Sequence, residues 1–261
     1  MIKLEVHGLE PAIRGMRNPK RSKGHPNPGD SGRCESTTID CSCCIYGDYN
    51  GQFCTATEFN PFILGPKDEK LAVSLAQAGP VHGKFLRQIQ VWVDITAPLY
   101  WWKEFDTYKV GTTANSASTM HMIMEDPFEI TDFSTDHLNA GHYGLLAVIV
   151  ATLNEDRRNY LLHDQWLKEH AGRDFNDPFY DDKVEYHEDK KKHYWWQIIQ
   201  TLGTNYNQLR TINLNYEVLR NIYNNRRYHK LDEWKEFCKW IETLPYSELI
   251  TGVDKDGHKV L

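Results

Sequence analysis

Two stretches of this 261-residue chain carry side chains suited to holding an anionic or aromatic ligand. Residues 98–121 end in a run of small hydroxyl residues that includes Ser116 and Ser118, and residues 202–226 carry several amides and end at Arg226. Hydroxyls and backbone N–H groups in a tight turn can bind a phosphate without a cation. A guanidinium stabilises negative charge that develops on a carbonyl oxygen or ring nitrogen. The two stretches are therefore the candidates for a ligand site.

Each candidate also has an ordinary structural interpretation, and the sequence leaves both open. Ser116 and Ser118 also fit a plain surface turn, and a lone histidine such as His121 is more often structural than catalytic. The asparagines of the second stretch also fit the polar side of a half-buried helix. Its arginine also fits a solvated helix end.

A cysteine cluster forms a third feature with potential chemistry. Six cysteines are present, and five of them fall within residues 34–54. In a reducing compartment such a cluster holds free thiols or a metal more often than disulfides. One Cys-x-x-Cys pair occurs, without a second pair at zinc-ribbon spacing. A structural zinc would draw its ligands from Cys34, Cys41, Cys44 and Cys54. Free thiols in a loop-rich segment are the favoured alternative.

Composition excludes several classes of protein. The net charge is −6, whereas a nonspecific nucleic-acid binder is usually basic, so no nucleic-acid partner is expected. No apolar run reaches the roughly 18 residues that a membrane helix needs. The first residues lack the apolar core of a signal peptide. A cytoplasmic protein without a membrane partner is the expectation.

The elements that position the first stretch follow from periodicity. Apolar and polar residues alternate over residues 87–96, which predicts a half-buried strand. Pro98 suits the first turn of a helix that packs Trp101, Phe105 and Tyr108 and ends at Gly111. Residues 112–119 then predict a small polar turn.

The remaining pattern is mostly helical. Helical spacing predicts helices over residues 67–78, about 135–170, 193–202, about 210–227, and from Asp232 with a buried apolar face. Residues 172–192 are charged and aperiodic, which predicts an exposed insertion or mobile loop. The order of elements predicts an α+β fold. We divide the chain into a loop-rich, Cys-containing N-terminal extension, 1–66, and a main domain, 67–261.

Three segments together resemble the flavin-dependent thymidylate synthases. Residues 71–98 resemble the helix, glycine-containing turn and strand that precede the family signature. That signature is an Arg-His-Arg triplet followed by a Ser, an Asn-Glu pair, a Ser and an Arg-Tyr pair. Aligned on Asn115, the corresponding residues are Tyr108-Lys109-Val110, then Thr113, Asn115-Ser116, Ser118 and Met120-His121.

The third segment, residues 202–226, resembles the family's Leu-Pro-x-Asn segment leading into an Asn-x-Arg-x-Leu-x-Asn helix that ends in a functional Arg. The ungapped matches are Leu202, Asn205, Asn215, Leu219, Asn221 and Arg226. The resemblance spans residues 67–245 and is to a divergent branch, of the kind found in phage and bacterial proteins.

The resemblance implies a fold and an activity. The fold would be ThyX-like, with a small mixed sheet and a helical bundle. The activity would be methylation of dUMP, or a related pyrimidine nucleotide, at C5 with FAD, methylenetetrahydrofolate and NADPH. The family's homotetrameric state would also carry over, with sites between copies.

It also implies roles for individual residues. The residues matched to catalysis are Arg226 and Ser118. Those matched to substrate binding are Ser116, Ser118, Lys109 and His121. Those matched to the flavin are Asn215, Asn221, Lys109 and Thr113.

The chain departs from the family at several charged positions. Lys109 is the only cation left in the triplet, and Ile199, Met120 and Glu217 stand where the family has arginines. Phosphate-directed guanidiniums contribute about 1.5–3 kcal/mol per charged hydrogen bond, so their loss weakens nucleotide binding unless other cations replace them. Residues considered as replacements are Lys103, Lys109, Arg210 and Arg220. The alternative functions are a catalytically inactive ThyX-like nucleotide-binding or assembly protein, and a zinc-stapled interaction module built on residues 34–54.

Overall fold

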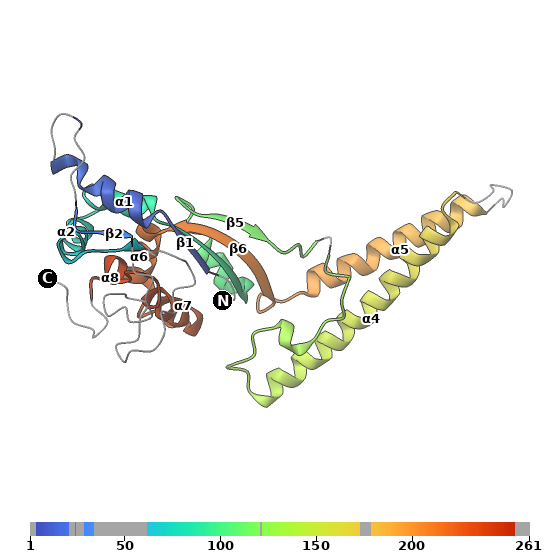
Figure 1. The fold of residues 1–261 in the computed structure, drawn as a ribbon. Coiled ribbons are helices and arrows are strands. Elements are labelled where there is room, and N and C mark those ends of the chain that lie inside the picture. Colours follow the sequence, from blue (N-terminus) through green and yellow to red (C-terminus); the bar gives the residue numbers. More distant parts are fainter. Residues whose placement is uncertain are drawn as a thin grey trace, which may run out of the picture. The chain divides into compact units, whose positions relative to one another are not determined.

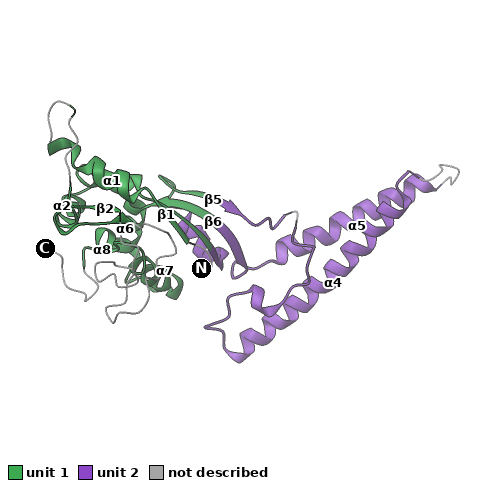
Figure 2. Cartoon of the chain, in the orientation of Figure 1, with its two compact units in different colours: residues 1–94, 108–114, 211–261 green, residues 95–107, 115–210 purple. Residues whose placement is uncertain are grey.

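The fold is described here from a computed structural model, which describes residues 4–20, 24, 29–33, 62–120, 122–172 and 179–253 (Figure 1). The proposed zinc ligands, Cys34, Cys41, Cys44 and Cys54, lie outside these residues, and so does His121. The chain divides into two compact units (Figure 2). Unit 1 comprises residues 1–94, 108–114 and 211–261, and unit 2 comprises residues 95–107 and 115–210. The division at residue 66 stays a prediction.

The α+β class is confirmed, and the sheets are antiparallel where a mixed sheet was expected. The larger sheet has the order β1-β4-β6-β5. Its strands are β1 (Leu4–His7), β4 (Gln90–Pro98), β5 (Thr113–Ser116) and β6 (Asn207–Asn215). A second sheet pairs β2 (Gly32–Arg33) with β3 (Phe62–Ile63). Each of β4, β5 and β6 contributes residues to both units.

Strand β4 follows the predicted alternation closely. Ile89, Val91 and Val93 are at most 1% exposed, and Trp92 between them is 38% exposed. β1 pairs antiparallel with β4, with Leu4 opposite Val93. β1 and the helix after it lie in the extension 1–66, which was predicted only to be loop-rich, because a four-residue strand carries too little pattern to identify.

Unit 1 also contains several short helices. They are α1 (Leu9–Met16), α2 (Pro66–Gln77), α6 (Tyr216–Arg226), α7 (Asp232–Glu242) and α8 (Glu248–Thr251), with the 3-10 helices η1 (Asn18–Lys20) and η2 (Gly83–Gln88). The predicted buried face of α7 is confirmed, since Trp234, Phe237, Cys238 and Ile241 are at most 2% exposed. Burying each large apolar side chain stabilises the fold by about 1.5–3 kcal/mol.

The helix predicted from about residue 210 is wrong over its first part. Residues 207–215 form β6, and α6 begins only at Tyr216. Ile212 and Leu214 are fully buried and alternate with the exposed Thr211 and the half-buried Asn213, which is the period of a strand. Asn215 is therefore the residue that caps α6, and not a position on its surface.

Unit 2 begins with the aromatic helix α3 (Leu99–Phe105). Trp101, Trp102 and Phe105 are at most 2% exposed, with ring centroids 4.8–5.4 Å apart. Trp102 Nε1 donates a hydrogen bond of 2.9 Å to the Gln208 carbonyl oxygen. The helix ends at Phe105, six residues before the predicted end at Gly111. The predicted polar turn at 112–119 is in part the strand β5, whose residues are exposed.

The rest of unit 2 contains η3 (Ile130–Asp132) and two long helices, α4 (Ala140–His170) and α5 (Tyr180–Thr201). These two helices lie side by side (Figure 1). The loop predicted for 172–192 is wrong from residue 180 onward, because α5 starts there. Lys191 of α5 reaches Asp164 of α4 with Nζ 2.5 Å from Oδ1.

Among the helices of the described ranges, none combines the length and apolar character that a membrane crossing would require.

Candidate functional site

Unit 1 contains a cleft of about 640 Å³ beside helix α6. This volume is within the range of 300–1,000 Å³ that is usual for small-ligand sites. Helix α6 packs against η2, and the cleft lies along residues of both. Its lining residues are Pro80, Arg87, Val110, Gly111, Asn215, Glu217, Val218, Arg220, Asn221 and Asn224. The cleft therefore joins segments that are more than a hundred residues apart.

Asn215 forms the buried end of the cleft. The residue is 8% exposed, and its Oδ1 accepts a hydrogen bond of 3.1 Å from the Val218 backbone N–H. This bond satisfies one of the free N–H groups at the start of α6. Gly111 approaches the same side chain: a Cβ at Gly111 would lie 2.9 Å from Asn215 Nδ2. Gly111 also has a φ of +78°, a conformation that favours glycine.

A charged pair lies in the cleft. Arg220 Nη2 is 3.1 Å from both carboxylate oxygens of Glu217, and Arg220 Nη1 donates to the Ala76 carbonyl oxygen. The pair is largely shielded, with side chains 15% and 18% exposed. A second guanidinium, that of Arg87, is exposed and makes a long contact of 3.5 Å with the Pro80 carbonyl oxygen.

The amide Asn221 lies on the outer part of the cleft. Its residue is exposed, and its Oδ1 accepts a hydrogen bond of 2.8 Å from Asn225 Nδ2. Asn215 and Asn221, both predicted to contact a flavin, are thus brought together by the fold.

Arg226 lies away from this cleft. Its Nε donates a hydrogen bond of 3.0 Å to Tyr108 Oη, and its guanidinium carbon lies 4.9 Å from the centre of the Trp234 ring. Five positions along an α-helix correspond to a rotation of about 140°, so Arg226 and Asn221 point to different sides of α6. Asn215 precedes this helix as its N-cap.

The other predicted residues are less enclosed. Within unit 1, Lys109 and Thr113 are exposed, and Lys109 directly precedes the cleft residue Val110. Within unit 2, Ser116 is exposed at the end of β5. Ser118 is half-buried, and its Oγ accepts a hydrogen bond of 3.3 Å from the Met120 backbone N–H. The zinc prediction stays untested, because Cys34, Cys41, Cys44 and Cys54 lie outside the described ranges. Within those ranges, no group of three or more potential metal ligands occurs.

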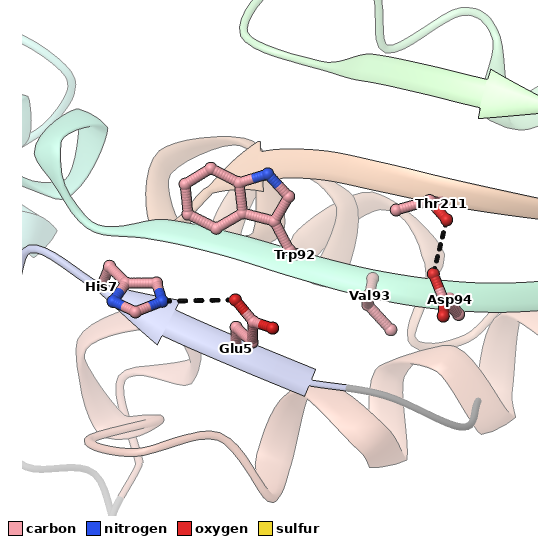
Figure 3. A pocket seen from close by; sticks show the side chains of 6 residues that line it. All are labelled: Glu5, His7, Trp92, Val93, Asp94 and Thr211. Atoms are coloured by element: carbon pink, nitrogen blue, oxygen red, sulfur yellow. Dashed lines mark hydrogen bonds and ion pairs between the residues drawn. The ribbon is translucent and has the colours of Figure 1, made fainter.

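A second cavity, of about 310 Å³, lies on the outer side of the sheet in unit 1 (Figure 3). Glu5 Oε2 is 3.5 Å from His7 Nε2, and Thr211 Oγ1 donates a hydrogen bond of 2.6 Å to Asp94 Oδ1. The half-exposed indole of Trp92 stands beside them. Two carboxylates repel a phosphate, so this cavity is a poorer site for a nucleotide than the cleft.

Sequence reasoning missed part of the cleft. Glu217, Arg220, Asn221 and Asn224 recur at helical spacing along one side of α6, which could have indicated a common surface. Arg87 has no such signal. It comes from η2, and only the packing of η2 against α6 brings it to the cleft.

Comparison with known proteins shows which solved structures have a similar fold. No family model and no curated protein matches the chain. A crystal structure of thymidylate synthase X (ThyX) from Helicobacter pylori with FAD and dUMP is similar, with a TM-score of 0.52 and 14% identity over 96% of this chain and 97% of that chain. A second structure of flavin-dependent thymidylate synthase ThyX from the same organism, complexed with FAD and dUMP, has a TM-score of 0.46 and 16% identity over 75% and 85% of the two chains. The resemblance drawn from the sequence is therefore confirmed at the level of the fold: this chain is a divergent protein with a ThyX-like fold.

Proposed function

We propose that the chain is a flavin-dependent thymidylate synthase-like enzyme that methylates dUMP, or a related pyrimidine nucleotide, at C5. The observation that carries the proposal is the meeting of Asn215 and Asn221, the two asparagines matched to flavin contacts, in one cleft of a ThyX-like fold. Methylenetetrahydrofolate would supply the carbon and NADPH the reducing equivalents.

The cleft residues fit a flavin nucleotide in chemical type. Asn215, Asn221 and Asn224 offer amides for the edges of a ring or a ribose, and Arg87 and Arg220 offer guanidiniums for phosphates. Lys109 and Thr113 would add contacts from the neighbouring segment. FAD, when bound, supplies the hydride, while the protein binds and orients the reactants.

The substrate side of the proposal rests on five residues. Ser116 and Ser118, with Lys109 and His121, would bind the nucleotide. Arg226 would stabilise negative charge on the pyrimidine ring, and its contact with Tyr108 and Trp234 holds the guanidinium in a fixed orientation. Because Arg226 and Asn221 face different sides of α6, we infer that a complete site draws residues from more than one copy of a homotetramer.

A second candidate function is a catalytically inactive ThyX-like protein that binds a nucleotide or serves in assembly. One observation favours it. Tyr108 stands at the first arginine of the family triplet, and its hydroxyl accepts the Arg226 Nε–H, a donor that a substrate would otherwise use.

The test is a titration of the purified protein with FAD, followed by visible absorption, and then with dUMP. The enzyme proposal expects a perturbed flavin spectrum that changes again with dUMP, and release of tritium from dUMP labelled at C5. Flavin and dUMP binding without tritium release would favour the inactive protein. No spectral change at any FAD concentration would reject the flavoenzyme.

A pair of variants ties the result to the cleft. Asn221→Ala should weaken FAD binding roughly 5- to 10-fold, the effect of losing about one hydrogen bond. Asn18→Ala is the control, since Asn18 is an exposed asparagine of η1 that is not among the cleft residues. Equal effects of the two substitutions would remove the cleft from the proposal.

A further inference from the structure

We propose that Arg87 and Arg220 form a phosphate subsite in which Glu217 is an internal counter-ion that a bound phosphate displaces. The inference rests on the proposed function for the identity of the ligand only. The subsite itself follows from the charges and the geometry of the cleft.

The charges of the cleft favour an anion. Among its lining residues, Arg87 and Arg220 are cationic and Glu217 is anionic, and the others carry no charge. The balance is two positive charges against one negative, or +1. The cavity on the outer side of the sheet carries the opposite balance, with Glu5 and Asp94. An anionic ligand therefore partitions to the cleft.

The Glu217 carboxylate is paired with the Arg220 guanidinium, which is the group that a phosphate would bind. Its two carboxylate oxygens lie 3.1 Å from Arg220 Nη2, and both side chains are mostly shielded from water. Arg220 Nη1 is fixed on the Ala76 carbonyl oxygen, so the guanidinium stays in place when its anionic partner changes. A phosphate, like a carboxylate, offers a guanidinium two oxygens at bidentate spacing, and it has more acceptor atoms.

The neighbourhood of Arg220 indicates the shape of the ligand. A further cavity of about 390 Å³ shares Arg220 and Asn224 with the cleft and adds Arg227 and the carboxylate of Glu248. Arg220 thus lies between two cavities, each lined by arginine. This arrangement suits a ligand with phosphates at its centre and a group on either side, which is the chemistry of a diphosphate-linked dinucleotide.

The experiment measures binding of inorganic pyrophosphate and of ADP to the full chain by calorimetry. Glu217→Gln should tighten both roughly tenfold, because the internal competitor loses its charge and the buried guanidinium becomes available. Arg87→Ala should weaken both by a similar factor. The matched controls are Glu236→Gln and Lys84→Ala, which remove exposed charges from α7 and η2 outside the cleft and should leave both affinities unchanged.

The outcomes separate this inference from the proposed function. If FAD binds but Glu217→Gln leaves pyrophosphate and ADP affinity unchanged or lower, the subsite is rejected while the flavoprotein stands. If FAD does not bind but the ADP affinities of the variants change as expected, the subsite stands without the flavin. Failure of pyrophosphate to bind both the unaltered chain and Glu217→Gln overturns the subsite.

Discussion

The Nδ1 atoms of His163 and His187 lie 2.9 Å apart between helices α4 and α5. At this distance one imidazole donates a proton and the other accepts it, so the contact requires at least one neutral ring. His163 is 7% exposed, and the His187 ring stacks on Trp166 with centroids 3.9 Å apart. The pair therefore joins the two helices at a partly buried position where a second proton would place two donors face to face.

The first prediction is that this pair makes the α4–α5 contact weaken in acid. Burial, then the charges of His187 and Lys190, lowers the pKa of His163. Burial, then His170, lowers the pKa of His187. Below about pH 6.5 the unfolded chain takes up protons that the folded pair does not, so stability is highest above that value and falls with decreasing pH. Urea unfolding at pH 7.5 and 5.5, followed by far-UV circular dichroism, measures the difference.

A double variant checks the assignment. His163→Phe with His187→Phe keeps two rings beside the aromatic neighbours Trp166, Tyr186 and Tyr194, and it should flatten the pH dependence. His142→Ala, which removes an exposed histidine at the start of α4, should leave the dependence unchanged. A pH dependence that survives the double substitution would assign the effect to other groups.

The same pair explains why the hydrophobic pattern of the sequence did not predict the first part of α5. The side of α5 that packs on α4 includes His187, Lys191, Tyr194 and Ile198, at intervals of four, three and four residues. This is regular helical spacing, but two of the four residues are polar. A hydrophobic pattern therefore misses the helix, because the histidine and the lysine find their partners only on α4.

The second prediction concerns the two roles of Asn215. Asn215→Ala removes the cap of α6 and should cost about 1 kcal/mol of stability, together with any amide contact to FAD. Asn215→Ser keeps an oxygen that can cap the helix but removes the amide nitrogen. Serine should therefore restore most of the melting temperature while FAD binding stays weak. Restoration of both by serine would make Asn215 a cap alone.

The third prediction concerns Gly111. Gly111→Ala should cost about 1–2 kcal/mol from the left-handed backbone, plus the displacement of Asn215 by the new Cβ. Gly79→Ala is the matched control, since Gly79 has a φ of +103° but nothing within 4 Å of the added Cβ. Comparing the thermal unfolding of both variants isolates the stability loss that the contact with Asn215 causes. In FAD titrations, Gly111→Ala alone should weaken binding. Equal stability losses would show that the close approach to Asn215 is unimportant.

Local pattern thus predicted elements better than it predicted the site. The alternation of Ile89, Val91 and Val93 and the apolar face of α7 are properties of neighbouring residues, and both are confirmed. The end of β6 was missed because Asn215 reads equally well as a helix residue and as a cap. Arg87 could not be assigned to the cleft, because its position depends on packing between segments distant in sequence.

The last prediction concerns Arg226, whose contacts give it both a structural and a catalytic interpretation. Its guanidinium lies over Trp234 and bonds Tyr108 Oη, so Arg226→Gln should lower stability by roughly 1 kcal/mol through the lost cation–π contact. If the guanidinium stabilises charge on the pyrimidine, tritium release from dUMP should fall about 100-fold or more.

Arg14→Gln is the control for this prediction, because Arg14 is an exposed arginine of α1 that lines neither the cleft nor the neighbouring cavity. It should lower tritium release little. Tyr108→Phe adds a finer test, since it keeps the ring and removes the acceptor of the Arg226 bond. A fall in turnover number with unchanged KM in Tyr108→Phe would mean that the hydroxyl orients Arg226 for the reaction. Increased turnover would mean that Tyr108 withholds the guanidinium from the substrate, as the inactive-protein proposal implies.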